Sequence, residues 1–155
     1  MTVLRIAFRT LLLSLLLVGC ARAASTPAAP SAGGEGAAFS YDDLMGALEA
    51  GGATVEPTGE LEQAFFSVIG RTIRIDGADV QVFEYVDEAS RLAESSLIAP
   101  DGGSIGTTMV TWVDQPTFWS KGRLIVLYVG REAAVIKKLG GLLGDPLTEP
   151  WPEQG

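Results

Sequence analysis

The sequence contains no histidine and only one cysteine, Cys20, among its 155 residues. The absence of histidine removes the commonest general base and metal ligand. It excludes Ser-His-Asp catalysis, Cys-His catalysis and histidine-containing zinc sites within this chain. Exported domains usually use their cysteines in pairs, and a single cysteine cannot form an internal disulfide. Cys20 is therefore expected to be a buried bystander, an intermolecular link or a modification site.

Basic residues are also scarce, because 11 Lys and Arg residues stand against 19 Asp and Glu residues and give a formal net charge of −8. No cluster of basic residues reverses this charge locally, and an acidic surface repels phosphate backbones, so nucleic-acid binding is not expected. The chain length predicts one domain. About 115 residues remain for it once residues 1–38 are set aside, which is enough for one modest hydrophobic core.

The first 20 residues have the three parts of a secretory leader. Arg5 and Arg9 form a positively charged start, an apolar run follows over residues 11–18, and the small residue Gly19 precedes Cys20. The apolar stretch of roughly 10 residues is half of the ~20 that a helix needs to span a bilayer. The pattern therefore predicts a cleaved signal peptide rather than a permanent transmembrane helix.

The residues Leu17-Val18-Gly19-Cys20 resemble the lipobox of bacterial lipoproteins, in which small or aliphatic residues precede a cysteine. The resemblance implies that Cys20 receives a diacylglyceryl thioether and that residues 1–19 are removed as a signal peptide by cleavage after Gly19. The new amino group is then open to acylation with a fatty acid such as palmitate. Several acyl chains give stable membrane attachment, at roughly 0.8 kcal/mol per buried CH₂. The alternative is an ordinary signal peptide cleaved at Ala21-Arg22-Ala23, with the cysteine discarded.

The predicted product is anchored outside the cytoplasmic membrane. Because Ala21 follows the cysteine, the resemblance implies the periplasmic face of the outer membrane in bacteria with two membranes, and the outer face of the plasma membrane in bacteria with one. Removal of residues 1–19 takes away two arginines and leaves a formal net charge of −10. Residues 20–38 then comprise the lipidated cysteine and a tether rich in Ala, Pro, Ser and Gly. We expect this tether to be disordered, with a reach of roughly 20–25 Å, because it has too few large apolar side chains to offset its ordering entropy.

A helix and a hairpin are the clearest local patterns within residues 39–147, which are predicted to form a single α+β domain. Ser40 and the acidic residues after it resemble a capping box, and the apolar spacing that follows predicts a helix that ends at a pair of glycines. Alternating apolar residues predict strands over 68–75 and 79–86. Asp76-Gly77 lies between these strands and favours a tight hairpin turn, because glycine accepts a positive φ angle.

Further elements complete the predicted fold. They are a strand at 53–56, a helix after Asp87, strands at 108–113 and 123–129, a helix at 131–143, and a tail over residues 148–155. The predicted order is α-β-β-β-α-β-β-α, and hairpins mixed with helices are typical of α+β folds. We therefore expect a two-layer sandwich, in which helices cover one face of a mainly antiparallel sheet of about five strands.

Between residues 65 and 130 the chain contains the segments FFSVIGRTIRIDGADVQVFEYVDEA, PDGGSIGTTMVTWV and GRLIVLYVG. These segments resemble an uncharacterised family of small bacterial proteins, many of which have lipoprotein leaders. The resemblance agrees with the predicted lipid anchor. It implies no activity for this chain.

Residues 114–121 are the strongest candidate for a binding surface. Pro116 is expected to prevent regular strand hydrogen bonding there, which predicts a connection rather than a strand. Phe118 and Trp119 are large apolar side chains for a connection, and aromatic residues are enriched at the centres of interfaces. Both are candidate contact residues for a partner, and the alternative is that both rings fold back over the sheet edge. Trp151, between two prolines in the tail, is either a lid on the domain or part of a frayed end.

Carboxylates are weaker candidates for chemistry. Glu84 shares a predicted strand face with valines, where partial burial could raise its pKa for acid–base work. An ion pair with Arg71 or Arg74 on the neighbouring strand explains it more simply. The glycine-rich run at 101–107 follows a helix and lacks the Gly-Lys-Ser/Thr of a phosphate-binding loop, so a turn is expected. The acidic pairs match no calcium loop, and neither a metal nor a cofactor is predicted.

These patterns favour a non-catalytic module that binds an envelope protein or a small ligand while its lipid holds it at the membrane. No catalytic residue is assigned. Two alternatives stay open. One is a hydrolase or transferase that uses Glu84 or Asp101, and the other is a structural component of an envelope complex.

Overall fold

The computed structural model describes residues 38–152 of the chain. The predicted signal peptide, the predicted lipidation site Cys20 and residues 21–37 lie outside the described residues, as do residues 153–155. The described elements are, in chain order, α1 (Tyr41–Ala50), β1 (Val55–Leu61), β2 (Gly70–Ile75), β3 (Ala78–Glu84), α2 (Glu88–Ser95), β4 (Ser104–Ile105), β5 (Thr108–Met109), β6 (Pro116–Lys121), β7 (Leu124–Val129) and α3 (Ala133–Leu143). The predicted α+β class is confirmed, and β4 and β5 form an additional short pair.

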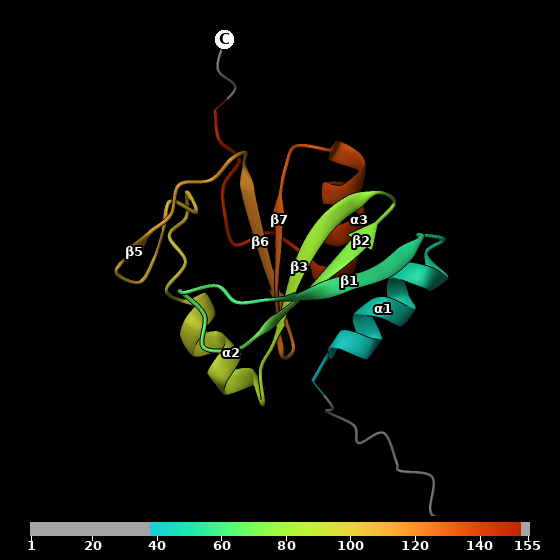
Figure 1. The fold of residues 1–155 in the computed structure, drawn as a ribbon, viewed down its shortest axis with the longest axis horizontal. Coiled ribbons are helices and arrows are strands. Elements are labelled where there is room, and N and C mark those ends of the chain that lie inside the picture. The colour runs from blue at the N-terminus through green and yellow to red at the C-terminus, as the bar shows by residue number, and fades with distance from the viewer. Residues whose placement is uncertain (1–37, 153–155) are drawn as a thin grey trace, which may run out of the picture. The chain divides into compact units, whose positions relative to one another are not determined.

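Five strands form one antiparallel sheet in the order β1-β2-β3-β7-β6, and β4 pairs with β5 separately (Figure 1). The hairpin of β2 and β3 turns at Asp76 and Gly77, whose φ angles of 50° and 97° are both positive. Two successive positive φ angles let a two-residue turn follow the twist of its strands. The predicted tight turn is therefore confirmed.

The sheet separates two hydrophobic clusters, one on each face. On one face α1 and α3 pack buried residues such as Leu48 and Leu139 against the strands. On the other face, the segments 61–68 and 98–112 surround buried residues that include Phe83. Figure 1 shows α1 and α3 on one side of the strands, with α2 and β5 on the other side. Both faces of the sheet are thus covered, which explains why β7 is buried along almost its whole length.

β1 is longer than the strand predicted at 53–56, and it continues through Pro57-Thr58-Gly59. Its register against β2 shifts between Pro57 and Gly59. An edge strand tolerates proline and an irregular register, because one of its sides forms no ladder hydrogen bonds. The sequence pattern predicted that the strand ends where this irregularity occurs.

The predictions between residues 108 and 121 are wrong in their details. Within the predicted strand at 108–113, only Thr108–Met109 is a strand, and β6 occupies the predicted connection. Pro116 is the first residue of this edge strand, and its carbonyl accepts a hydrogen bond from the Thr148 hydroxyl on the outer side. The backbone nitrogen of Pro116 also faces away from β7, so its missing N–H removes no ladder bond.

Candidate functional site

Phe118 and Trp119 are fully buried, so the predicted exposure of these two rings as contact residues is wrong. Successive side chains of a strand point to opposite faces. Phe118 therefore enters one cluster, where its ring centroid lies 5.8 Å from that of Trp112, and Trp119 enters the cluster beneath α1 and α3. Both rings serve the core, which is close to the alternative that they fold back onto the sheet.

The C-terminal residues run along the outer edge of β6. The Leu147 N–H donates to the Phe118 carbonyl over 2.7 Å, and the Phe118 N–H donates to Thr148 Oγ1 over 3.2 Å. Further along, the indole Nε1–H of Trp151 donates to the Asp101 carbonyl over 2.8 Å. The predicted tail therefore begins inside the domain. Trp151 was predicted to be either a lid on the domain or part of a frayed end, and the structure favours the lid.

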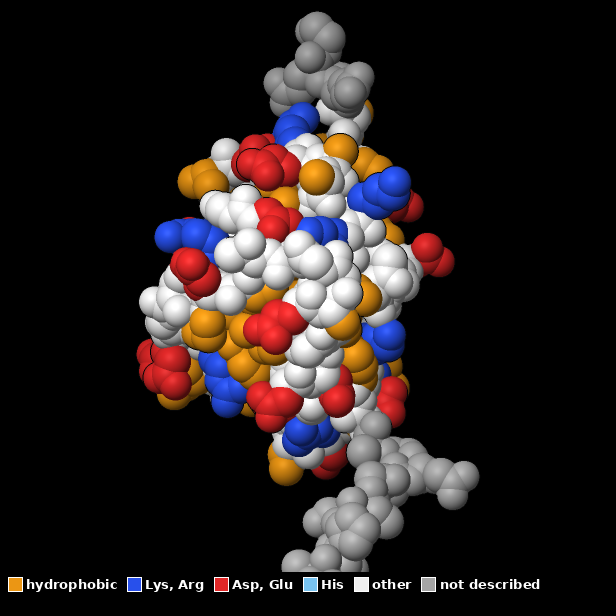
Figure 2. Space-filling view, turned by 90° about the vertical axis from the view of Figure 1, so that its right-hand side faces the viewer, with side chains coloured by type: hydrophobic (Ala, Val, Ile, Leu, Met, Phe, Trp, Pro, Cys, Tyr) orange, Lys and Arg blue, Asp and Glu red, His pale blue; other side chains and the backbone are white. Residues whose placement is uncertain are grey.

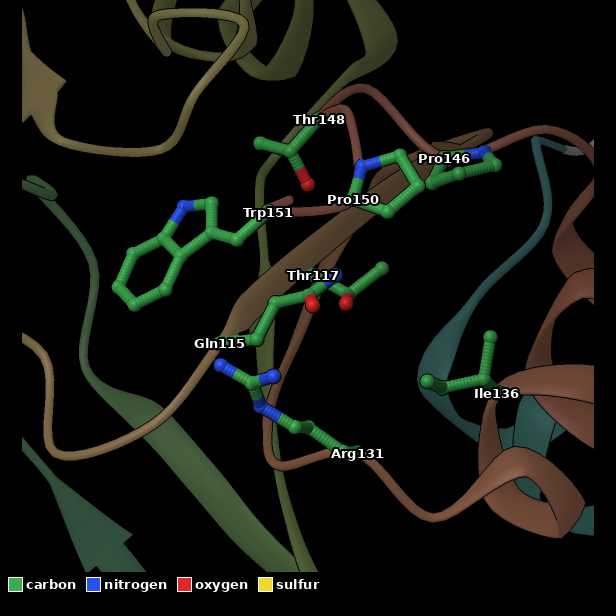
Figure 3. Close-up of a pocket in the computed structure, with 8 residues that line it drawn as sticks. All are labelled: Gln115, Thr117, Arg131, Ile136, Pro146, Thr148, Pro150 and Trp151. Atoms are coloured by element: carbon green, nitrogen blue, oxygen red, sulfur yellow. The ribbon is translucent and has the colours of Figure 1, made fainter. Parts of the chain in front are cut away.

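This C-terminal segment, β6 and the start of α3 line a half-open cavity of about 350 Å³, which we name the C-terminal pocket (Figure 3). Its lining residues are Gln115, Thr117, Arg131, Ile136, Pro146, Thr148, Pro150 and Trp151. Most of its wall is apolar, and a few polar groups converge on it from separate segments. Cavities of this composition are typical of small-molecule sites.

Arg131 supplies the charge of the C-terminal pocket. Its Nε donates a hydrogen bond of 2.7 Å to Asp114 Oδ1, which also accepts from the Gln115 N–H over 2.7 Å. The hydrogen bond from Arg131 lowers the pKa of the Asp114 carboxyl, so this carboxyl is ionised at neutral pH. Within residues 38–152 neither Nη nitrogen of Arg131 has a hydrogen-bond acceptor, and the side chain is 46% exposed. Figure 3 shows the guanidinium reaching towards Gln115.

Thr117 lies at the centre of the lining residues (Figure 3). It is only 4% exposed, and its Oγ1 has no hydrogen-bond partner among the described residues. A buried hydroxyl without a partner destabilises a fold by about 1–3 kcal/mol, and such groups are rare in native proteins. The Thr117 hydroxyl can gain a partner from a polar group that enters the pocket.

Sequence patterns missed Thr117 and Arg131 as functional residues. Neither residue belongs to a motif, and they meet Trp151 only through the pairing of β6 with β7 and the course of the C-terminal segment. The one local signal was the placing of Trp151 between two prolines. An aromatic residue in such a setting has few ways to be covered except by the domain itself.

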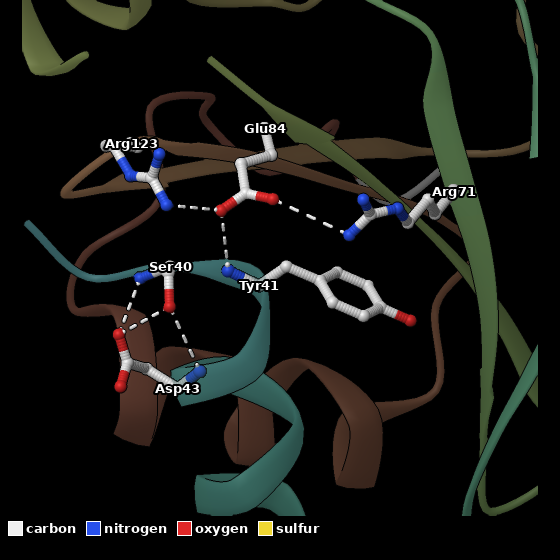
Figure 4. Close-up of polar contacts among 6 residues, drawn as sticks. All are labelled: Ser40, Tyr41, Asp43, Arg71, Glu84 and Arg123. Carbon is white, nitrogen blue, oxygen red and sulfur yellow. Dashed lines mark hydrogen bonds and ion pairs between the residues drawn. The ribbon is translucent and has the colours of Figure 1, made fainter. Parts of the chain in front are cut away.

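Glu84 belongs to a different polar group, which joins the sheet to the start of α1 (Figure 4). Its Oε1 accepts hydrogen bonds from Arg123 Nη2 over 2.8 Å and from the Tyr41 N–H over 3.2 Å. Its Oε2 lies 3.5 Å from Arg71 Nη1. The predicted ion pair with Arg71 is confirmed, whereas Arg74 has another partner and the Arg123 contact was not predicted. We name Glu84, Arg71, Arg123 and the Tyr41 N–H the Glu84 cluster.

The start of α1 is held by local contacts as well. The Ser40 N–H donates to Asp43 Oδ2 over 2.8 Å, and the Ser40 hydroxyl oxygen accepts from the Asp43 N–H over 3.3 Å. These two bonds confirm the predicted capping box. The Arg71 guanidinium lies 4.4 Å from the centroid of the Tyr41 ring, which adds a cation–π contact. The Glu84 cluster is thus a structural connection between α1 and the sheet.

Asp101 lies in a turn, as predicted. Its Oδ1 accepts from the Gly103 N–H over 2.8 Å, and Gly102 between them has a positive φ of 69°. The carbonyls of Asp101 and Gly102 accept hydrogen bonds from the indoles of Trp151 and Trp112. This turn presents carbonyl oxygens to its neighbours rather than a row of N–H groups, so it does not form a phosphate cradle.

A second hollow, of about 510 Å³, lies between α1 and α3. Its lining residues are Ala47, Leu48, Gly51, Ala134, Lys137, Lys138, Gly141 and Leu142. Figure 2 shows this side of the molecule, where hydrophobic side chains form a patch bordered by charged ones. Among the described residues the buried polar side-chain atoms without a partner belong to Thr117 and Trp119, and neither lines this hollow. The C-terminal pocket is therefore the stronger candidate site.

Neither a cluster of metal ligands among the described residues nor a similarity to known proteins indicates a further site. Within residues 38–152, no three His, Cys, Asp or Glu side chains lie close enough together to hold a metal ion. No helix in the described part of the chain has both the length and the apolar character needed to cross a membrane. No family model matches the chain, and neither a curated protein nor a solved structure matches it.

Proposed function

We propose that this chain is an extracytoplasmic lipoprotein whose domain is a non-catalytic module that binds a small ligand in the C-terminal pocket. Acyl groups on Cys20 hold the chain at a membrane in this proposal. The observation that carries the binding role is a set of polar groups without partners inside a largely apolar cavity. These groups are the buried hydroxyl of Thr117 and the two solvent-exposed Nη nitrogens of Arg131, which have no acceptor among residues 38–152.

The chemistry of the pocket lining favours binding over catalysis. The lining side chains include neither a carboxylate nor a thiol, and the chain has no histidine. A general base needs a free lone pair within reach of the substrate. The two carboxylates considered for hydrolysis are engaged elsewhere, Glu84 by the Glu84 cluster and Asp101 by its own turn.

Mass spectrometry of the full chain, purified from the membrane of its own host, tests the anchor. We expect the N-terminal peptide to begin at Cys20 and to carry the mass of a diacylglyceryl group. A Cys20→Ser variant should lose the lipid and leave the membrane fraction. A free thiol at Cys20, or a chain that begins after it, would contradict this part of the proposal.

A small-molecule screen by NMR on the full chain tests the binding role. We expect ligands that shift the indole N–H signal of Trp151, because this ring forms one wall of the C-terminal pocket. These ligands should stop binding to Ile136→Phe, which fills the cavity. They should still bind to Leu92→Phe, the matched control, because Leu92 is 58% exposed on α2. Ligands that bind equally to both variants would contradict the assignment of the pocket.

A further inference from the structure

We infer that the C-terminal pocket recognises a carboxylate group attached to a small apolar body, and that Arg131 binds this carboxylate. The inference rests on the proposed binding function and adds the chemical class of the ligand. Three features of the described residues support it: the free edge of the guanidinium, the charge of the lining, and the buried hydroxyl of Thr117.

The free edge of the Arg131 guanidinium has the geometry for a carboxylate. Asp114 occupies the Nε side, which leaves the two Nη nitrogens as a planar pair of donors. A carboxylate can accept two parallel hydrogen bonds from such a pair. The Gln115 N–H holds the same Asp114 oxygen over 2.7 Å, so Asp114 acts as a positioning residue that orients the guanidinium.

The charge of the lining favours a single negative charge on the ligand. Arg131 is the one charged residue among the eight that line the C-terminal pocket, and the neighbouring Asp114 balances part of its charge. Phosphate monoesters carry nearly two negative charges at neutral pH and are usually held by several cations or by a row of N–H groups. The lining offers neither. A carboxylate therefore suits this pocket better than a phosphate does.

The buried hydroxyl of Thr117 also needs a partner that an anion can provide. Carboxylate oxygens accept hydrogen bonds and do not donate them. Thr117 and Arg131 line the same cavity, so a carboxylate beside Arg131 can accept from its Nη nitrogens and, once rotation about χ1 turns the buried Thr117 hydroxyl towards the cavity, from that hydroxyl as well. The missing hydrogen bond of Thr117 would then be made in the bound state.

The apolar wall and the volume limit the rest of the ligand. The wall is formed by Ile136, Pro146, Pro150 and the ring of Trp151, which its hydrogen bond to the Asp101 carbonyl holds in place. The volume of about 350 Å³ is near the lower end of the usual range for ligand sites, about 300–1,000 Å³. A body the size of one aliphatic or aromatic side chain therefore fits within this volume. A free carboxylic acid and the C-terminal residue of a peptide both meet this description.

Two pairs of probes with the same branched body test the inference on the full chain by NMR. The first pair is 3-methylbutanoate and 3-methylbutanamide, which represent a free acid. The second pair is N-acetyl-leucine and N-acetyl-leucinamide, which represent the end of a peptide. We expect both acids to shift the Trp151 indole signal and to bind about tenfold more tightly than their amides, as one charge-assisted pair predicts.

Three variants show which group is responsible. Arg131→Gln should remove the preference for acids, and Arg131→Lys should retain only part of it, because a lysine keeps the charge and loses the planar pair of donors. Arg74→Gln is the matched control, since Arg74 also pairs with an aspartate and its side chain is 45% exposed, but it does not line the pocket. It should leave all four affinities unchanged.

The outcomes separate this inference from the proposed function. Amides that bind as tightly as their acids, with shifts in the same pocket signals, would overturn the carboxylate inference and leave the binding function standing. A preference for acids that persists in Arg131→Gln would also overturn it. An absence of any shift with all four probes, together with no ligand from the small-molecule screen, would overturn both. Tighter binding of N-acetyl-leucine than of 3-methylbutanoate would support a peptide terminus as the source, and the reverse would support a free acid.

Discussion

The Glu84 cluster and the C-terminal pocket are both built around an arginine and a carboxylate, but they differ in how many of their polar groups have partners. In the cluster, Glu84 faces two guanidinium groups and a backbone N–H, and its side chain is only 22% exposed. In the pocket, Arg131 has one of its three nitrogens paired. Thr117 beside it is buried without a partner.

This difference distinguishes a structural ion pair from a candidate site. A network in which every member is satisfied rigidifies the fold and leaves nothing for a ligand. A network that leaves a buried hydroxyl without a partner keeps that group at a cost in stability, which a ligand can offset. Breaking the first network should therefore change stability, and breaking the second should change binding.

The largest effect on stability is expected in the hydrophobic core, at Trp119 of β6. Trp119→Ala removes a fully buried indole from the cluster under α1 and α3, and should lower the free energy of unfolding by about 3–5 kcal/mol. Urea unfolding of the full chain measures this change. An unchanged midpoint would mean that the ring is exposed, as expected for a contact residue.

The next largest effect is expected in the Glu84 cluster. Glu84→Gln leaves Arg71 and Arg123 without their carboxylate, and should lower the free energy of unfolding by about 2 kcal/mol. Glu56→Gln, on the exposed edge strand β1 and opposite Arg74, is the matched control and should change it by less than about 0.5 kcal/mol. Equal effects of the two substitutions would show that the Glu84 cluster is no stronger than a surface charge.

Substitution of Thr117 should have the opposite result to substitution of Glu84, with ligand affinity reduced and stability maintained. Thr117→Val keeps the shape of the side chain and removes a buried hydroxyl that has no partner. The free energy of unfolding should stay unchanged or rise by up to about 1 kcal/mol, because no hydrogen bond within the domain is lost. Affinity for 3-methylbutanoate should fall several-fold in the same variant. A drop in stability would instead reveal a hidden partner inside the domain.

The smallest effect is expected from the exposed aspartates. Hydrogen bonds from Lys138 and Arg131 lower the pKa values of Asp76 and Asp114, respectively. A carboxyl with a lowered folded pKa stabilises the fold above its unfolded pKa of about 4, and this contribution is lost as the pH falls through the folded value. The urea midpoint should therefore decrease below about pH 4. Asp76→Asn and Asp114→Asn should each flatten this decrease slightly, because both pairs are exposed to solvent.

The parts of the fold that were predicted correctly depend on neighbours in the sequence. The capping box needs only Ser40 and Asp43, and the turn at Asp76-Gly77 needs only the tolerance of those two residues for positive φ angles. The ion pair between Glu84 and Arg71 followed from the register that this turn imposes on β2 and β3. Each of these contacts is decided within a short stretch of chain, where propensity and pattern are informative.

The parts that were missed depend on where a strand lies in the sheet. A proline such as Pro116 disfavours a central strand, because it cannot donate a ladder hydrogen bond. It is tolerated in an edge strand when its nitrogen faces outward. Only the strand order shows that β6 is an edge strand. Phe118 and Trp119 are buried because hydrophobic clusters cover both faces of the sheet at this strand, which the local pattern does not indicate. Arg123 reaches Glu84 only because β7 pairs with β3.

By itself the sequence determined the α+β class, the positions of the three helices and of the tight turn, and the absence of histidine chemistry, because each depends on local pattern or on composition. Its leader pattern also supports the proposed anchor at Cys20. Only the tertiary structure decided that β6 is an edge strand, that its aromatic rings are core, and that Thr117, Arg131 and Trp151 line one cavity. These three residues come from separate segments, and their contact depends on sheet order and on the course of the C-terminal segment, which local propensities do not encode.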